Sequence, residues 1–167
     1  QLAEAEHLRR AGIYQFNRSF GLARLHYTAL VEKYSGSAST PDALYQIGRG
    51  HILELNYQEA VKWFERVHAE FPTHPLAEAA LSQAASAYSR LNKPKEAVTR
   101  YQKFIEKHPD SDTLERGYLN IVDIQRDLGE TADALKWTQK TREAFKGELA
   151  EALALFAQTR IRIAEGN

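Results

Sequence analysis

ALYQIGRGHILELNYQEAVKWFERVHAEFP, residues 43–72, predicts two amphipathic helices joined by a short turn. Small and apolar residues recur at three- and four-residue steps in each half, which is the spacing of one helix face. They are Leu44, Ile47, Gly48, His51 and Leu55, followed by Ala60, Phe64, Val67 and Phe71. Asn56 and Tyr57 separate the halves, and Pro72 ends the second helix because a proline ring cannot continue it. We expect Gly48 and Ala60 to lie where the two helices touch, with Phe64 behind them.

The same pattern recurs every 37 residues. An alanine begins the apolar face of each second helix, at Ala23, Ala60, Ala97 and Ala134. Four positions later stand Tyr27, Phe64, Tyr101 and Thr138. A fixed period of this size is typical of a stacked helical-repeat array. The first helix is less regular: Leu8, Ala11 and Gly12 form its predicted inner face, with a register one residue shorter than in the next unit. Because Thr138 and Thr141 replace larger residues, we expect the fourth repeat to be loosely packed or to lie against something outside the chain.

Six positions match the tetratricopeptide (TPR) repeat in order: Leu44, Gly48, Tyr57, Ala60, Phe64 and Pro72. The chain therefore resembles TPR proteins. The resemblance implies an all-α fold, a right-handed superhelical array (α-solenoid) of antiparallel helix pairs with about four and a half repeats. We expect one array over residues 1–167, with approximate boundaries at 3–39, 40–75, 76–111, 112–146 and a half repeat at 147–167. The usual TPR period is about 34 residues, so we place the extra residues in links such as FPTHPLAEAA (71–80), which would contain Ala77.

Composition excludes several classes of protein. The chain has 22 Lys and Arg and 22 Asp and Glu, and a net charge of zero argues against a nucleic-acid-binding surface. It has no cysteine, which excludes a disulfide framework and a Cys-type zinc site. No apolar run approaches the roughly 18 residues of a membrane span. The chain starts without methionine, and its last half repeat is apolar nearly all round, so we expect a fragment of a longer protein.

The sequence shows no cluster of residues with an obvious chemistry. Glu4–His7 and Glu65–His68 have the Glu-x-x-His spacing of di-iron bundles, but we interpret both pairs as solvated helix residues. His108 falls at a packed position, where we expect a core histidine with a hydrogen bond at its tip. No phosphate-binding loop or nucleophile motif is present. We therefore predict no catalytic residue, no metal site, no cofactor and no enzymatic activity for this chain, although a full-length protein could carry a catalytic domain elsewhere.

The first helix of each repeat lines the concave groove in TPR proteins, and this resemblance supplies the predicted partner-binding residues. They are Tyr45, Arg49 and Ile52; Gln83, Ser86 and Arg90; and Arg116, Leu119, Asn120, Asp123 and Arg126. A peptide with a carboxylate and an apolar side chain would suit such a surface. Alternatively, these arginines pair only with neighbouring carboxylates and form a solvated face.

The two tryptophans, Trp63 and Trp137, occupy equivalent repeat positions, each three residues after the alanine that begins a second helix. They are either surface anchors for a partner or cover a seam between helices. Packing is the usual role of aromatic residues at helical spacing, so we favour the seam.

The long period and the links FPTHPLAEAAL and HPDSDTLERGYL resemble bacterial envelope TPR proteins. These are the Tol–Pal-associated periplasmic repeat proteins, the lipoprotein of the β-barrel assembly machine and the helical arm of soluble lytic murein transglycosylases. The resemblance implies a periplasmic or cell-envelope location, with the cytoplasm as the alternative. The leading hypothesis is a non-catalytic scaffold that binds a protein or peptide partner in its groove, possible partners including peptidoglycan-related machinery. The alternative hypothesis is the helical arm of a larger envelope enzyme such as a lytic murein transglycosylase.

Overall fold

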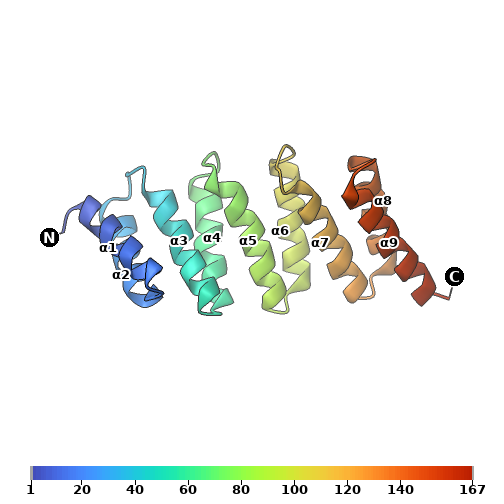
Figure 1. Cartoon of the computed structure of the whole chain (residues 1–167), viewed down its shortest axis with the longest axis horizontal. Coiled ribbons are helices and arrows are strands. Elements are labelled where there is room, and N and C mark those ends of the chain that lie inside the picture. Colours follow the sequence, from blue (N-terminus) through green and yellow to red (C-terminus); the bar gives the residue numbers. More distant parts are fainter. Residues whose placement is uncertain (1, 167) are drawn as a thin grey trace. The chain divides into compact units, whose positions relative to one another are not determined.

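The computed structural model describes residues 2–166, which form nine α-helices and no β-strand (Figure 1). The predicted all-α fold is confirmed. The helices are α1 (Glu4–Phe16), α2 (Phe20–Lys33), α3 (Thr40–Leu53), α4 (Tyr57–Glu70), α5 (Leu76–Arg90), α6 (Pro94–Lys107), α7 (Leu114–Asp127), α8 (Thr131–Ala144) and α9 (Leu149–Ala164).

The chain divides into two compact units, Gln1–Lys93 with α1 to α5 and Pro94–Asn167 with α6 to α9. In the first unit each helix packs on the next one along the chain, and α3 also contacts α5. In the second unit α6, α7, α8 and α9 pack in the same sequential way, and α7 also contacts α9. In both units, therefore, a helix contacts its sequence neighbour and also the helix two further on, as expected for stacked helix pairs.

The contact between α3 and α4 leaves no room for a side chain on Gly48. A Cβ atom at this position would lie 2.8 Å from Cε1 of Phe64. Phe64 is fully buried, and Ala60, one turn earlier on α4, is fully buried as well. The close approach that the sequence predicts between Gly48 and Phe64 is confirmed, and Ala60 belongs to the same core cluster as Phe64.

In the second unit a glycine again lies beneath a phenylalanine. A Cβ atom on Gly117 of α7 would lie 2.9 Å from Cδ1 of Phe104 on α6. Phe104 is 1% exposed, so its ring is held by the surrounding core. The glycine therefore sets how closely these two helices approach.

Thr138 and Thr141 of α8 are both fully buried. Their hydroxyl groups donate to backbone oxygens of their own helix, Thr138 to Leu135 and Thr141 to Trp137, each at 2.7 Å. A buried hydroxyl is tolerated when it is hydrogen-bonded in this way. The helices of the second unit therefore close over both threonines themselves.

The turn that ends each first helix is left-handed at one fixed repeat position. Arg18, Leu55, Asn92 and Gly129 stand 37 residues apart and have φ angles of 58°, 60°, 56° and 72°. This turn, rather than the spacing of apolar residues, fixes the register of the first repeat. Ala11, which is fully buried, is then the equivalent of Gly48, whereas Gly12 is exposed.

Two expectations for these turns are therefore wrong. The first repeat carries no one-residue shift, because Arg18 and Leu55 occupy equivalent turns. Leu55 does not extend the inner face of α3: it belongs to the turn, where a left-handed backbone directs it outward, and it is 70% exposed.

The link before α5 is shorter than expected. Ala77 belongs to α5 and is fully buried, so its predicted place in a link is wrong. The helix begins early because Pro75 already has helical backbone angles, with φ −53° and ψ −29°. The His74 ring also accepts a hydrogen bond from the amide of Leu76 at 3.2 Å, which satisfies one of the amide groups that a helix leaves free at its start.

Candidate functional site

Three of the predicted partner-binding residues lie on one face of α3, at steps of four and three residues: Tyr45, Arg49 and Ile52. The Tyr45 ring is half-buried and packs on Phe64, with ring centroids 5.4 Å apart. Burial raises the pKa of Tyr45, so it stays a neutral hydroxyl. Arg49 is exposed and donates only a long hydrogen bond to Gln46, 3.4 Å from Nη1 to Oε1. Within the described residues Arg49 forms no ion pair, so its charge is available to a partner.

The neighbouring helix α5 offers smaller groups. Gln83 and Ser86 are half-buried, and Arg90 at the end of the helix is exposed. No carboxylate in the described chain forms an ion pair with Arg90. Because α3 and α5 are in contact, the first unit presents two unpaired guanidinium groups and a tyrosine on adjacent first helices.

The predicted residues of α7 differ in their electrostatics. Arg126 donates to Asp123 at 2.7 Å and to Asp127 at 2.9 Å, so its charge is already compensated. These contacts raise the pKa of Arg126, first through the hydrogen bond with Asp127. Arg116 is exposed and has no such partner among the described residues. The interpretation that arginines pair with neighbouring carboxylates therefore holds for Arg126, but not for Arg116. Leu119 and Asn120 are half-buried beside them.

Residues of α9 that were not predicted from the sequence as part of a site join this set. Leu119, Asp123 and Arg126 of α7 line a cleft of about 210 Å³ together with Leu153, Phe156 and Arg160 of α9. Phe156 is 62% exposed, and the guanidinium carbon of Arg160 lies 5.8 Å from the centre of its ring. The signal that could have found these residues is the repeat period, which extends into the last half repeat.

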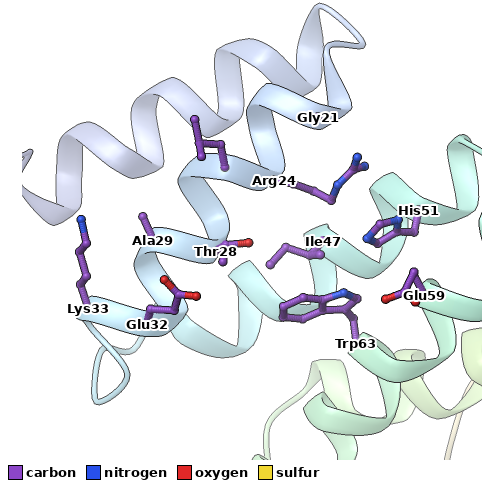
Figure 2. A pocket seen from close by; sticks show the side chains of 11 residues that line it. Gly21, Arg24, Thr28, Ala29, Glu32, Lys33, Ile47, His51, Glu59 and Trp63 are labelled. Atoms are coloured by element: carbon purple, nitrogen blue, oxygen red, sulfur yellow. The ribbon is translucent and has the colours of Figure 1, made fainter.

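A second cleft, of about 520 Å³, lies between α2 and α4 in the first unit (Figure 2). Its apolar lining includes Ile47 and Trp63, and Arg24, His51 and Glu59 lie at one end in Figure 2. Burial lowers the pKa of His51, which favours the neutral ring at pH 7. Two of the four charged residues that line this cleft are already paired, since Arg24 bonds to Glu54 and Glu59 to Lys62.

The two tryptophans have different environments. Trp137 is only 7% exposed and packs edge-on against Tyr118 of α7, with ring centroids 5.5 Å apart. It covers a seam between helices, and the hypothesis of a surface anchor is wrong for this residue. Trp63 is half-buried and lines the second cleft, with the Arg66 guanidinium 5.1 Å from its ring centre. Trp63 is therefore still accessible to a partner.

The two residues of the first Glu-x-x-His pair, Glu4 and His7, contact different partners. His7 is 6% exposed and shares a hydrogen bond with His26 of α2, 3.0 Å between their Nδ1 atoms. Glu4 instead accepts a hydrogen bond from the hydroxyl group of Ser37. The interpretation of His7 as a solvated residue is therefore wrong, because in the corrected register it replaces the core residue Leu44. No group of three or more metal-binding side chains occurs in residues 2–166.

His108 is half-buried against Phe104, with ring centroids 6.0 Å apart. Its Nε2 atom is buried and has no hydrogen-bond partner in the described part of the chain. The expected hydrogen bond at the ring tip is therefore not formed with the described residues.

Comparisons with known proteins support the fold and identify a family. The YfiO family model, described as outer membrane lipoprotein, matches residues 37–160. The crystal structure of MamA covers 98% of this chain and 82% of its own, with a TM-score of 0.74 and 13% identity. A tetratricopeptide repeat protein from Parabacteroides merdae covers 95% of this chain, with a TM-score of 0.76 and 14% identity, and this chain spans 60% of that protein. At such identities the two structures support the fold alone. No curated protein sequence matches significantly. None of the described helices is long and apolar enough to cross a bilayer.

Proposed function

The chain belongs to the YfiO family of outer membrane lipoproteins, and from that premise we propose that it is a non-catalytic interaction scaffold of the cell envelope. Its partner is a protein or peptide, which binds to the exposed face of the first helices. Each unit has its own set of proposed contact residues. In the first unit they are Tyr45, Arg49 and Ile52 of α3 and Gln83, Ser86 and Arg90 of α5, and in the second unit they are Arg116, Leu119, Asn120, Asp123 and Arg126 of α7.

The observation that carries this proposal is the difference in charge pairing among these arginines. Arg49, Arg90 and Arg116 are exposed and form no ion pair with the described residues, whereas several arginines elsewhere do, such as Arg66 with Glu70 on α4. A guanidinium group offers planar, charge-assisted donors to a carboxylate. Next to Arg49, Tyr45 presents a partly buried ring on a rigid core, a typical anchor at protein interfaces.

The family also supports a place of action. We assign the protein to the periplasmic side of the envelope and its partner to envelope proteins, with the peptidoglycan-related machinery as the first set to test. Zero net charge gives no support for a nucleic-acid partner. The helical arm of a lytic transglycosylase is not favoured, because the family match is to an outer membrane lipoprotein.

The experiment is a pull-down from envelope extract with the wild-type chain and the Arg49→Ala/Arg90→Ala variant. The partner recovered by the wild type should be lost from the double variant and should elute at increasing salt, because exposed charge pairs are screened. Arg66→Ala is the control, since it removes a half-buried arginine of α4 that already pairs with Glu70. Equal recovery by all three proteins, with equal salt sensitivity, would refute the proposed site.

A further inference from the structure

The left-handed turn position extends to the end of α9. Gly166 has a φ angle of 79° and stands 37 residues after Gly129, which ends α7 in the same way. The series Arg18, Leu55, Asn92, Gly129 and Gly166 thus fixes α9 as a first helix in the register of α3 and α7. The sequence alone left this register uncertain, because α9 has apolar residues on most of its circumference.

In this register α9 repeats the residue types of α3. Phe156, Arg160 and Ile163 are the equivalents of Tyr45, Arg49 and Ile52, each 111 residues later. Both sets comprise an aromatic residue, an arginine four positions on and an isoleucine three positions after that. The intervening helices differ at these positions: α5 has Ser82, Ser86 and Ser89, and α7 has Leu119, Asp123 and Arg126.

These residues of α9 are not the ones that face a second helix. In α3 and α7 the positions that meet the second helix include Gly48, beneath Phe64, and Tyr118, against Trp137. Their equivalents in α9 are Thr159 and Leu155. A helix packed on α9 in that way would cover Leu155 and Thr159 and would leave the face with Phe156 open.

The charges in the cleft between α7 and α9 leave one cation unpaired. Arg126 is compensated by Asp123 and Asp127. Arg160 forms no ion pair within residues 2–166 and lies over the Phe156 ring. Leu119 and Leu153 complete an apolar wall beside it, and Leu153 is 44% exposed.

We propose that the cleft between α7 and α9 is a docking site for an extended peptide segment that carries a large apolar side chain and, two residues away, an internal carboxylate. The inference rests on the proposed function and extends it to residues of α9. Side chains two residues apart in an extended chain point to the same side, about 6.6–6.8 Å apart. That spacing is close to the 5.8 Å between the Arg160 guanidinium and the Phe156 ring.

An internal carboxylate suits this cleft better than a chain terminus. A terminal carboxylate is usually held by several donors at once, such as a nest of backbone amides. Here one unpaired guanidinium, that of Arg160, is available, because Arg126 already serves two aspartates. The charged residues that line the cleft are Asp123, Arg126 and Arg160, which leave one positive charge in excess. One Asp or Glu side chain neutralises this excess, and the apolar side chain covers Phe156.

The test is a titration of the isotope-labelled 167-residue chain, followed by amide NMR shifts. The probe is the peptide acetyl-Gly-Phe-Gly-Glu-Gly-amide, added up to about 10 mM to detect a Kd of ~1 mM. Saturable shifts should appear in α7 and α9. Replacing the glutamate by glutamine should weaken binding about two- to fivefold, the range of an exposed ion pair. Phe156→Ala should weaken it more than about fivefold, as expected for an aromatic anchor.

Arg160→Ala should reproduce the effect of the glutamine peptide. Leu155→Ala is the matched control, an exposed apolar residue on the other face of α9, and should leave the Kd within about twofold of the wild type. The proposal is overturned if no saturable shift appears in α7 and α9, if the glutamate and glutamine peptides bind alike, or if anionic phospholipid vesicles, but not the peptide, perturb α9 through Phe156. Arg49→Ala/Arg90→Ala should not affect this titration. Loss of the pull-down partner in that double variant without peptide binding at α9 would therefore reject this inference and keep the proposed function.

Discussion

Gly48→Ala tests the helix packing most directly, because it adds a single methyl group to the tightest contact of the first unit. The new Cβ would lie 2.8 Å from Cε1 of Phe64 and 3.0 Å from Cδ1 and Cζ. The ring cannot move aside easily, since Phe64 is fully buried and also packs against Tyr45. Either α3 and α4 must separate or the ring must leave its preferred rotamer.

Two opposing terms set the size of the effect. Alanine in a helix interior is favoured over glycine by roughly 0.5–1 kcal/mol. Overpacking a closed core costs about 1–3 kcal/mol. We therefore expect Gly48→Ala to destabilise the chain by about 1 kcal/mol. Gly12→Ala is the control, because Gly12 lies inside α1 and its Cβ would have no atom within 4 Å. Gly12→Ala should gain only the preference of alanine over glycine in a helix. The free energies of unfolding of the two variants should therefore differ by about 1–3 kcal/mol, the overpacking cost.

The assay is urea unfolding followed by far-UV circular dichroism. Unfolding midpoints are the safer measure here, because helical repeats do not always unfold in one cooperative step. The midpoint should fall for Gly48→Ala and rise for Gly12→Ala. In a Phe64→Leu background the cost of Gly48→Ala should shrink, since the ring that it meets is gone. Equal midpoint changes for the two glycine variants, or no relief from Phe64→Leu, would show that the contact does not limit the packing.

Ala97→Leu should destabilise by about 1–3 kcal/mol, because Ala97 is fully buried, whereas the exposed Ala132→Leu should have little effect on the same urea midpoint. Thr138→Phe, which restores the bulk of the other repeats, should also cost about 1–3 kcal/mol because Thr138 is fully buried; a stabilised variant would reveal unfilled space in the second unit. His26 has a lowered pKa, mainly through burial and then through the nearby His7, so its folded pKa lies below its unfolded value of about 6.5. The unfolded chain then binds the proton more tightly, so this contribution to stability is complete above pH ~6.5 and is lost as the pH falls toward the folded pKa. Melting temperatures at a series of pH values should show this loss, and it should be smaller in His26→Phe.

The sequence by itself determines the helices and most of their packing faces. A helix face is read from local spacing, so the 37-residue period already predicts paired helices and the contact of Gly48 with Phe64. It also predicts which face of α3 presents Tyr45 and Arg49. Local spacing gave the wrong result at two places. It aligned Gly12, instead of Ala11, with Gly48, and the prolines of the link before α5 led to a predicted start of this helix that is later than the actual one.

Only the tertiary structure decided which predicted groups remain free. Arg126 and Arg49 hold groove positions in equivalent first helices, yet only Arg126 is compensated by aspartates. Trp137 and Trp63 have identical repeat positions, yet Trp137 is buried against Tyr118 while Trp63 lines a cleft. Side-chain pairing and burial depend on neighbours contributed by other helices, and a periodic pattern read along one helix does not contain that information.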